Sequence, residues 1–559
     1  MRIRHGTITV AIASLLVAGL PAVATASTVG ARAATIVASP TSLDFGPSDV
    51  DVDGPSLKTL IVANGTGPVT LGAPTIGGPT PGAFRISGNT CTGVTLAAGQ
   101  RCEVAITPRA TADGPQTATL LVPNNSGTNP LVVPLSLRGE VTPRGTFYPI
   151  GEQRLLDTRR GVGAPARPIG ANRAIAVQVS RIAGVPRVGA SAVVLNVTAT
   201  SATANSYLTV YPTGVPTRPT ASSLNFVPGR TTANMVTVPL GADGKVDIYN
   251  ANGSVDVVAD LLGYYASDNS IPNHGGALGS AYQPIDPVRM LDTREILPGG
   301  LPGGHYIRAA ATWGPEVDSH VKAFVVNVTA VTPRDGGYLT AFNGRSNPYI
   351  DTSTLNYAPG RNVPNLAVVQ ALPCADCGGI TGWPSIAVYS SATTHVLVDI
   401  VGFFDDSSLP GGLRFTPLTP TRIADSRTGL GVPSRLGADD SATVVPPATV
   451  LTPDTAALSM NVTAVRASRT TFLTVWPAGT DMPTVSNLNP ATGQTVANAA
   501  LTALGTGNAF EVYNSLGSVD VVVDVVGRHW VYPGTDTAAG ARGKAPAPKV
   551  SHGPVVRGH

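Results

Sequence analysis

Aspartates and asparagines recur in a fixed order along residues 146–530 of this 559-residue sequence. An Arg-x-x-Asp-x-Arg motif opens each of three copies, an Asn-Val-Thr and a Leu-Asn segment follow, and an apolar segment with one further aspartate closes the copy. The complete set is Asp157, Asn196, Asn225 and Asp260 in the first copy, Asp292, Asn327, Asn356 and Asp399 in the second, and Asp425, Asn461, Asn489 and Asp524 in the third.

Carboxylate and amide oxygens in this order support two interpretations. If the four residues of one copy converge on a pocket, they offer the hard oxygen donors that Ca²⁺ prefers, and each copy holds a structural calcium ion. In the interpretation that we favour, the aspartate of the motif lies between guanidinium groups and braces a turn at the first strand. An asparagine in an apolar strand needs hydrogen-bond partners in either case. We therefore expect no cofactor, with calcium as the alternative.

Aromatic residues at the ends of the copies are a second candidate site. Exposed aromatic rings stack on sugar rings, so these residues could form a carbohydrate-binding surface, whereas packing in the core or at a sheet edge is the favoured alternative. The aromatic candidates are Tyr264, Tyr265, Phe403, Phe404 and Trp530.

The sequence contains no recognisable catalytic motif. No histidine occupies an equivalent position in all three copies, and neither Gly-x-Ser-x-Gly nor His-Glu-x-x-His occurs. A glycosidase needs only two carboxylates brought together by the fold, which a sequence does not reveal. We therefore expect a protein that is not an enzyme, with a glycoside or peptide hydrolase as an alternative.

The elements that must position these residues are β-strands. Residues 193–200 alternate between two faces, with Val193, Leu195, Val197 and Ala199 on one face and Val194, Asn196, Thr198 and Thr200 on the other. The closing segments 254–262, 395–401 and 518–526 are apolar on both faces, which is typical of central strands covered on both sides. Charged residues make up only 13% of the chain, which argues against long helices with solvated faces.

The sequence thus predicts an all-β protein of tandem β-sandwich domains, one Ig-like sandwich followed by three homologous β-sandwich or jelly-roll-like repeats, arranged as a rod. The Gly- and Pro-rich stretches between the strand-rich segments are expected to be linkers. The expected segments are a signal peptide at 1–26, an Ig-like domain at 35–140, repeat 1 at 146–267, a linker at 268–281, repeat 2 at 282–405, a linker at 406–411, repeat 3 at 412–530 and a disordered tail at 531–559.

Two family resemblances support this division. Segments such as Leu43-Asp44-Phe45-Gly46 and Phe84-Arg85-Ile86-Ser87 resemble the Ig-like domains of the ASPM/SPD-2/Hydin type and related bacterial choice-of-anchor domains. The ordered markers of the three copies resemble tandem repeats of secreted actinobacterial-type proteins, which occur alone or attached to peptidases and cell-wall amidases. The second resemblance implies an extracellular or cell-surface location and supplies no ligand.

The N-terminus and the cysteines indicate export. A basic start and a short apolar segment precede small residues, which predicts a signal peptide cleaved between Ala26 and Ala33 and leaves no membrane span afterwards. Four cysteines in an exported chain predict two local disulfides. A zinc half-site, a redox pair and a regulatory switch are the alternatives for the second pair. The pairs are Cys91 with Cys102 and Cys374 with Cys377.

The amino-acid composition limits the classes of molecule that this protein can bind. A net charge of +3 and few charged residues exclude a nucleic-acid binder, which needs clustered Lys and Arg. We expect a secreted or cell-surface protein whose β modules adhere to or bind cell-wall or extracellular polysaccharide or protein, and similar copies would raise the effective concentration. A purely structural spacer or stalk is a further alternative.

Overall fold

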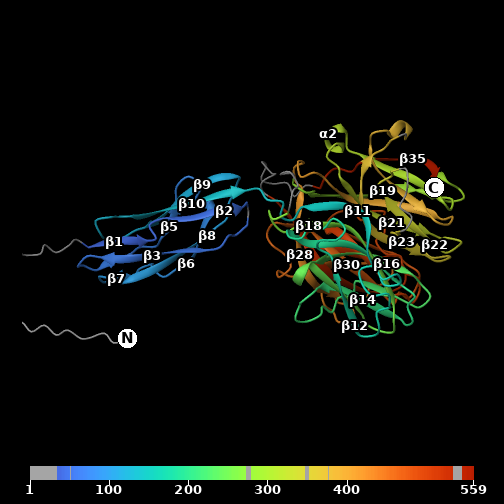
Figure 1. Ribbon diagram of the computed structural model, residues 1–559, viewed down its shortest axis with the longest axis horizontal. Helices are drawn as coiled ribbons and strands as arrows, with labels where there is room; N and C mark the ends of the chain where they lie inside the picture. Colours follow the sequence, from blue (N-terminus) through green and yellow to red (C-terminus); the bar gives the residue numbers. More distant parts are fainter. Residues whose placement is uncertain are drawn as a thin grey trace, which may run out of the picture. The chain divides into compact units, whose positions relative to one another are not determined.

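The computed structural model describes residues 34–50, 52–271, 278–345, 352–375, 377–532 and 544–558 (Figure 1). The signal peptide at 1–26 and its cleavage site lie outside these residues. The all-β class is confirmed, because strands account for nearly all regular structure. None of the described helices is long and apolar enough to cross a membrane. The short helices are α1 (Thr293–Ile296), α2 (Pro315–Asp318) and the 3₁₀ turns η1 (Pro81–Ala83), η2 (Ala242–Gly244), η3 (Gly378–Ile380) and η4 (Thr506–Asn508).

The chain forms two compact units, and the first contains the Ig-like segment. Two antiparallel four-stranded sheets, in the orders β1-β3-β8-β6 and β2-β10-β9-β5, form a sandwich. A disulfide joins Cys91 to Cys102 in β8, as expected from the sequence. The strands are β1 (Thr35–Ser39), β2 (Leu43–Asp49), β3 (Leu57–Asn64), β4 (Val69–Thr70), β5 (Thr75–Gly77), β6 (Phe84–Asn89), β7 (Thr95–Leu96), β8 (Arg101–Pro108), β9 (Gly114–Val122) and β10 (Leu131–Glu140).

Repeat 1 is a sandwich of the sheets β11-β18-β13-β16 and β12-β17-β14-β15. The closing strand β18 is hydrogen-bonded to β11 on one side and to β13 on the other, so the expected central position of this segment is confirmed. The strands are β11 (Phe147–Asp157), β12 (Arg173–Gln178), β13 (Ala190–Thr200), β14 (Ser206–Pro212), β15 (Leu224–Phe226), β16 (Thr232–Pro239), β17 (Lys245–Asn250) and β18 (Asp256–Ala266).

Repeats 2 and 3 have the same plan, and a single pairing of Tyr282 with Leu413 joins their first sheets into one of eight strands. The strands of repeat 2 are β19 (Tyr282–Asp292), β20 (His305–Thr312), β21 (Ala323–Val331), β22 (Gly337–Phe342), β23 (Leu355–Tyr357), β24 (Val363–Gln370), β25 (Leu372–Pro373), β26 (Pro384–Ser390) and β27 (His395–Phe404). Those of repeat 3 are β28 (Leu413–Asp425), β29 (Asp440–Val444), β30 (Thr455–Val465), β31 (Leu473–Pro477), β32 (Val496–Ala503), β33 (Phe510–Asn514) and β34 (Asp520–Val531).

The three repeats are not separate domains in a row, because they belong to one compact unit (Figure 1). The equivalent strands β16, β24 and β32 contact one another, and a core shared by all three repeats surrounds them. Met235, Leu366 and Ala499 lie at matching positions of these strands and belong to that core. The apolar outer faces of the first sheets are therefore covered by the neighbouring repeats, which explains why the closing strands are apolar on both sides.

The expected disordered tail at 531–559 is wrong for much of its length. Val531 ends β34, and Tyr532 is buried. The C-terminal strand β35 (Lys549–Arg557) pairs antiparallel with β20 and so extends the second sheet of repeat 2. The composition of this segment does not indicate a strand. An edge strand is held mainly by backbone hydrogen bonds, which a Gly-, Pro- and Lys-containing sequence can still form. Residues 533–543 lie outside the described part of the chain.

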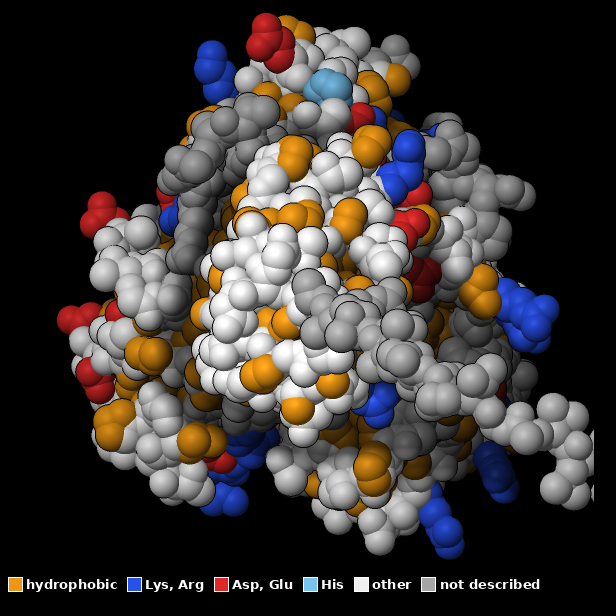
Figure 2. All heavy atoms as spheres, turned by 90° about the vertical axis from the view of Figure 1, so that its left-hand side faces the viewer, with side chains coloured by type: hydrophobic (Ala, Val, Ile, Leu, Met, Phe, Trp, Pro, Cys, Tyr) orange, Lys and Arg blue, Asp and Glu red, His pale blue; other side chains and the backbone are white. Residues whose placement is uncertain are grey.

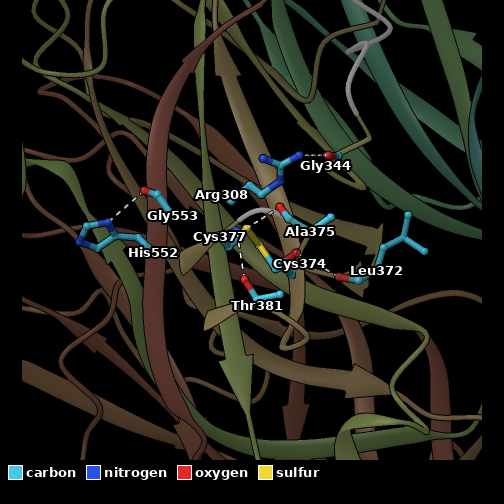
Figure 3. Close-up of a disulfide and its surroundings, with 10 residues drawn as sticks. Arg308, Gly344, Leu372, Cys374, Ala375, Cys377, Thr381, His552 and Gly553 are labelled. Carbon is cyan, nitrogen blue, oxygen red and sulfur yellow. Dashed lines mark hydrogen bonds between the residues drawn. A yellow bond between two sulfur atoms is a disulfide. The ribbon is translucent and has the colours of Figure 1, made fainter. Parts of the chain in front are cut away.

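The second expected disulfide, Cys374–Cys377, is present in the insertion that distinguishes repeat 2 (Figure 3). Both cysteines are buried together with Ala310 of β20 and Ile380. Figure 3 shows His552 and Gly553 of β35 beside this disulfide, and a Cβ added at Gly553 would lie 3.7 Å from the Cys377 sulfur. The insertion and the C-terminal strand are therefore packed together.

Candidate functional site

The Arg-x-x-Asp-x-Arg motif forms an ion-paired brace in each repeat. In repeat 1, Arg154 donates from Nε to Asp260 at 2.5 Å and from Nη1 to Asp157 at 3.3 Å. Asp157 also accepts from the backbone N–H of Arg159 at 3.0 Å and from its guanidinium at 2.8 Å. The brace thus ties the first strand to the closing strand. Equivalent braces join Arg289 to Asp292 and Asp399, and Arg422 to Asp425 and Asp524.

The two carboxylates of each brace have pKa values that move in opposite directions. Hydrogen bonds from Arg159 hold the pKa of Asp157 below its usual range, and burial raises the pKa of Asp260. Burial raises the pKa of Asp399 to about 6. The carboxylate on the turn is therefore stabilised by several donors, whereas Asp260 and Asp399 on the closing strands each accept hydrogen bonds from one arginine.

The structure brings three of the four candidate residues of repeat 1 together. Asn196 lies opposite Asp260 in the sheet, Arg154 joins Asp260 to Asp157, and Asp157 and Asn196 line one cavity. The asparagines of the Leu-Asn segments line a different pocket, described below. Within the described residues, no group of three or more His, Cys, Asp and Glu side chains is arranged to hold a metal ion. The alternative in which all four residues of a copy converge on one pocket is therefore wrong, because the Leu-Asn asparagine lies elsewhere, whereas the aspartate of the motif lies between guanidinium groups as the favoured interpretation expects.

The aromatic candidates are buried, as the favoured interpretation of core or edge packing expects, so the alternative of a carbohydrate-binding surface is wrong. Their exposed fractions are 3% for Tyr264, 2% for Tyr265, 1% for Phe403 and Phe404, and 6% for Trp530. Tyr264 and Phe403 pack in the cores of their own repeats, and Tyr265 and Phe404 belong to the core shared by the three repeats. They stabilise the interior and are not available to stack on a sugar.

Six aromatic side chains, two from each repeat, form a closed cluster at one end of the shared core. Each repeat contributes one ring from its first strand and one from its closing strand, and neighbouring ring centroids are between 4.1 and 5.5 Å apart. Repeat 3 contributes a fully buried histidine, whose Nε2 lies 2.9 Å from the Oγ of Ser459. The order around the cluster is Phe147, Phe404, Tyr282, His529, Phe415 and Tyr265.

Six buried asparagines, each at most 7% exposed, link the repeats in a closed ring. One asparagine of each repeat donates from Nδ2 to the Oδ1 of an asparagine in another repeat. The pairs, donor first, are Asn365 and Asn196 (2.9 Å), Asn498 and Asn327 (3.0 Å), and Asn234 and Asn461 (2.9 Å). Since repeat 2 reaches repeat 1, repeat 3 reaches repeat 2 and repeat 1 reaches repeat 3, the unit has three-fold pseudosymmetry.

The donor asparagines also accept hydrogen bonds from the backbone of another repeat. The Oδ1 of Asn365 accepts from the N–H of Met235, that of Asn498 from Leu366, and that of Asn234 from Ala499, each at 3.1 Å. Sequence reasoning missed these three asparagines. The sequence does indicate them, because each follows the Leu-Asn segment of its copy at the same spacing. They lie between two more prominent repeated features, the Leu-Asn segment and the closing apolar segment.

The Leu-Asn asparagines line a pocket of about 960 Å³ at the opposite end of the axis from the aromatic cluster. Residues from all three repeats form its wall, and β16, β24 and β32 begin at it. Asn225 accepts from the Oγ of Ser222 at 3.3 Å, and Asn356 donates to the Oγ of Ser353 at 3.1 Å. The backbone oxygens of the same serines accept from the asparagine ring, so the pocket wall is held by the ring beneath it.

This axial pocket is polar and positively charged. Asn225, Asn356 and Asn489 line it at equivalent positions, and Arg230, Arg361 and Arg466 also contribute to its wall. The described lining residues include no Asp or Glu. Burial, and then the charge of Arg361, lowers the pKa of Arg230, and both arginines line this pocket.

A second cavity, of about 710 Å³, lies between repeats 1 and 2 beside the brace. Glu152 lines it and accepts from the Oγ1 of Thr352 in repeat 2 at 2.7 Å. Burial, with a contribution from the charge of Asp260, raises the pKa of Glu152 to about 8. The hydrogen bond from Thr352 to Glu152 joins the first strand of repeat 1 to repeat 2.

Comparisons with known proteins identify no family. No protein-family model and no curated protein matches this chain. Among solved structures, the secreted serine protease VesC from Vibrio cholerae is 15% identical over 40% of this chain and 49% of that chain, about half its length, with a TM-score of 0.16. A triple jelly roll protein of an archaeal virus is 7% identical over 69% of this chain and 98% of that chain, with a TM-score of 0.14. The ICAM-5 D1–D4 ectodomain fragment is 12% identical over 84% and 99%, with a TM-score of 0.13.

Proposed function

We propose that this is an exported, non-catalytic protein that binds a cell-wall or extracellular glycan in the axial pocket of its three repeats. The observation that carries the proposal is the set of equivalent asparagines at the pocket wall, one from each repeat. Side-chain amides offer both donors and acceptors, which suits the hydroxyl groups of sugars. The volume of about 960 Å³ is in the range of pockets that take small ligands.

The absence of carboxylates from the described pocket wall favours binding over hydrolysis, since glycoside hydrolysis normally uses two of them. Sparse charge supports a glycan over a nucleic acid. On the face in Figure 2, Lys and Arg side chains are few compared with the polar and apolar ones. Because three copies build one pocket, this proposal involves one site per chain rather than three independent ones.

Retention of the full chain on insoluble peptidoglycan and polysaccharides tests the proposal. We expect retention above that of an unrelated protein, and we expect the triple variant Asn225→Ala, Asn356→Ala and Asn489→Ala to lose it. Asn64→Ala in the first unit, where the residue is exposed, is the matched control. If the chain is not retained at all, a structural spacer explains the molecule better. If glycosidase substrates are turned over, the non-catalytic assignment fails.

A further inference from the structure

Positive charge gathers in the axial pocket although the chain as a whole is nearly neutral. The chain has 37 Lys and Arg against 34 Asp and Glu. Arg230, Arg361 and Arg466 nevertheless line one pocket whose described wall residues include no carboxylate. The arginines of the braces, by contrast, lie beside aspartates. The excess at the pocket is therefore local and needs its own explanation.

Arg230 and Arg361 are half-buried, and the Nη1 of Arg361 is buried without a hydrogen-bond partner among the described residues. Arg230 lies near enough to feel the charge of Arg361. Leaving a buried cationic donor unpaired and placing a like charge beside it both oppose folding. An anion between the two guanidinium groups would remove both penalties at once.

The local backbone does not require arginine at these positions. Arg230 and Arg361 follow glycines in a left-handed turn, at φ 74° for Gly229 and 66° for Gly360. Repeat 3 has the same turn, with Gly493 at φ 74°, but it is followed by Gln494. The Oε1 of Gln494 folds back and accepts from the N–H of Ala491 at 2.9 Å. Glutamine is therefore compatible with the turn, so the two arginines are not explained by its structure.

Repeat 3 supplies its positive charge from another place. Arg466 follows β30 at φ 50°, and the equivalent residues of the other repeats are the uncharged Ser201 and Thr332. The pocket therefore receives one arginine from each repeat, although only two of them are at equivalent positions. Two non-equivalent positions of the repeat thus supply the same positive charge to the pocket. This favours a shared role of the three arginines there.

We propose that the axial pocket binds the anionic group of a saccharide, a carboxylate or a phosphate, between Arg230 and Arg361, with Arg466 adding to the attraction. The inference rests on the proposed function, because it assigns the chemical class of the ligand of the same pocket. Planar guanidinium groups bind both anions through paired hydrogen bonds. The asparagines at the wall would then bind the hydroxyl groups of the same sugar.

Ligand-observed NMR with the full chain and three matched sugars tests this inference. The probes are D-glucose, D-glucuronate and D-glucose 6-phosphate, which share a ring and differ in the anionic group. We expect one or both charged sugars to bind at least about tenfold more tightly than glucose, since a charge-assisted pair is worth about that factor. The charged sugar that binds more tightly shows whether the pocket prefers a carboxylate or a phosphate.

Arginine variants locate the site. Arg230→Gln and Arg361→Gln copy the residue that repeat 3 already has, and each should weaken binding of the charged sugar about tenfold without lowering the melting temperature. Gln494→Arg should strengthen it. Arg173→Gln, at an exposed position of β12, is the control.

The outcomes separate this inference from the proposed function. If glucose or neutral polysaccharide binds as well as the charged sugars, or if the glutamine variants bind the charged sugar like the unaltered chain, the anionic assignment is overturned and glycan binding stands. If neither the charged sugars nor any polysaccharide binds, both proposals fall. A loss of melting temperature in Arg361→Gln would assign the residue a structural role and also overturn the inference.

Discussion

The asparagine ring predicts that a change in repeat 1 destabilises repeats 2 and 3. Asn234 is fully buried in repeat 1 and makes three hydrogen bonds. Its Nδ2 donates to the Oδ1 of Asn461 at 2.9 Å and to the backbone oxygen of Ser223 at 2.6 Å, and its Oδ1 accepts from the N–H of Ala499 at 3.1 Å. Asn234→Ala leaves all three partners buried and unpaired.

The magnitude follows from these contacts. An unpaired buried donor or acceptor costs about 1–3 kcal/mol, so three of them cost about 3 kcal/mol or more, before any cavity effect. Two of the three partners belong to repeat 3, so most of the loss falls between repeats. A chain of independent repeats would confine the loss to repeat 1 instead.

Tryptophan fluorescence during urea unfolding separates these two cases. The four tryptophans are Trp313 and Trp383 in repeat 2 and Trp476 and Trp530 in repeat 3, so neither repeat 1 nor the first unit contributes to the signal. We expect one transition, shifted by Asn234→Ala to lower urea by the equivalent of about 3 kcal/mol. Asn205→Ala, an exposed asparagine of the same repeat, should shift it by less than about 0.5 kcal/mol. An unshifted tryptophan transition in Asn234→Ala would refute the closed ring.

Three further changes have defined outcomes. Burial lowers the pKa of His529 to about 3 against ~6.5 when unfolded, so below pH 6.5 the unfolded chain binds the extra proton and stability falls by about 1.4 kcal/mol per pH unit. The double variant His529→Phe, Ser459→Val restores the apolar pair of the other repeats. Urea unfolding between pH 6.5 and 4.5 should then show no such dependence of stability on pH. An unchanged pH dependence would contradict the role of His529. Deleting 549–559 exposes the edge of β20 and should lower the melting temperature and promote self-association, measured by light scattering. Cys91→Ser with Cys102→Ser should destabilise the first unit by about 2–3 kcal/mol, measured by circular dichroism, and leave the tryptophan transition unchanged.

Local sequence patterns predicted the strands, the central closing strands and the disulfides, because these depend on residues close in sequence. The alternation around Asn196 and the apolar segment that carries Asp260 are visible without any knowledge of the other repeats. Their partners are paired within one repeat, at register positions such as Arg154 opposite Asp260. The brace was accordingly the favoured interpretation of the motif.

The relation between the repeats was not predicted, because it depends on contacts far apart in the chain. Asn196 donates to the backbone oxygen of Ser353 at 2.6 Å, and the sequence of neither segment indicates that the two are in contact. The apolar outer face of β13 was a usable signal, since an exposed sheet face of that kind needs a cover. β35 was missed because pairing at a sheet edge depends on the backbone of β20.

Three-fold pseudosymmetry gives a criterion for separating structural residues from functional ones. A feature that the closed unit needs for folding is needed three times, as the braces and the asparagine ring are. A feature present once or twice is not required by the common fold. By this criterion Arg466, Arg230 and Arg361 share one function in the axial pocket. Repeat 3 has Gln494 at the position of the last two. His529 also breaks the symmetry, but Ser459 compensates for it locally, whereas the buried Nη1 of Arg361 has no hydrogen-bond partner among the described residues. Function in such a molecule is therefore best sought where its copies differ and their differences meet.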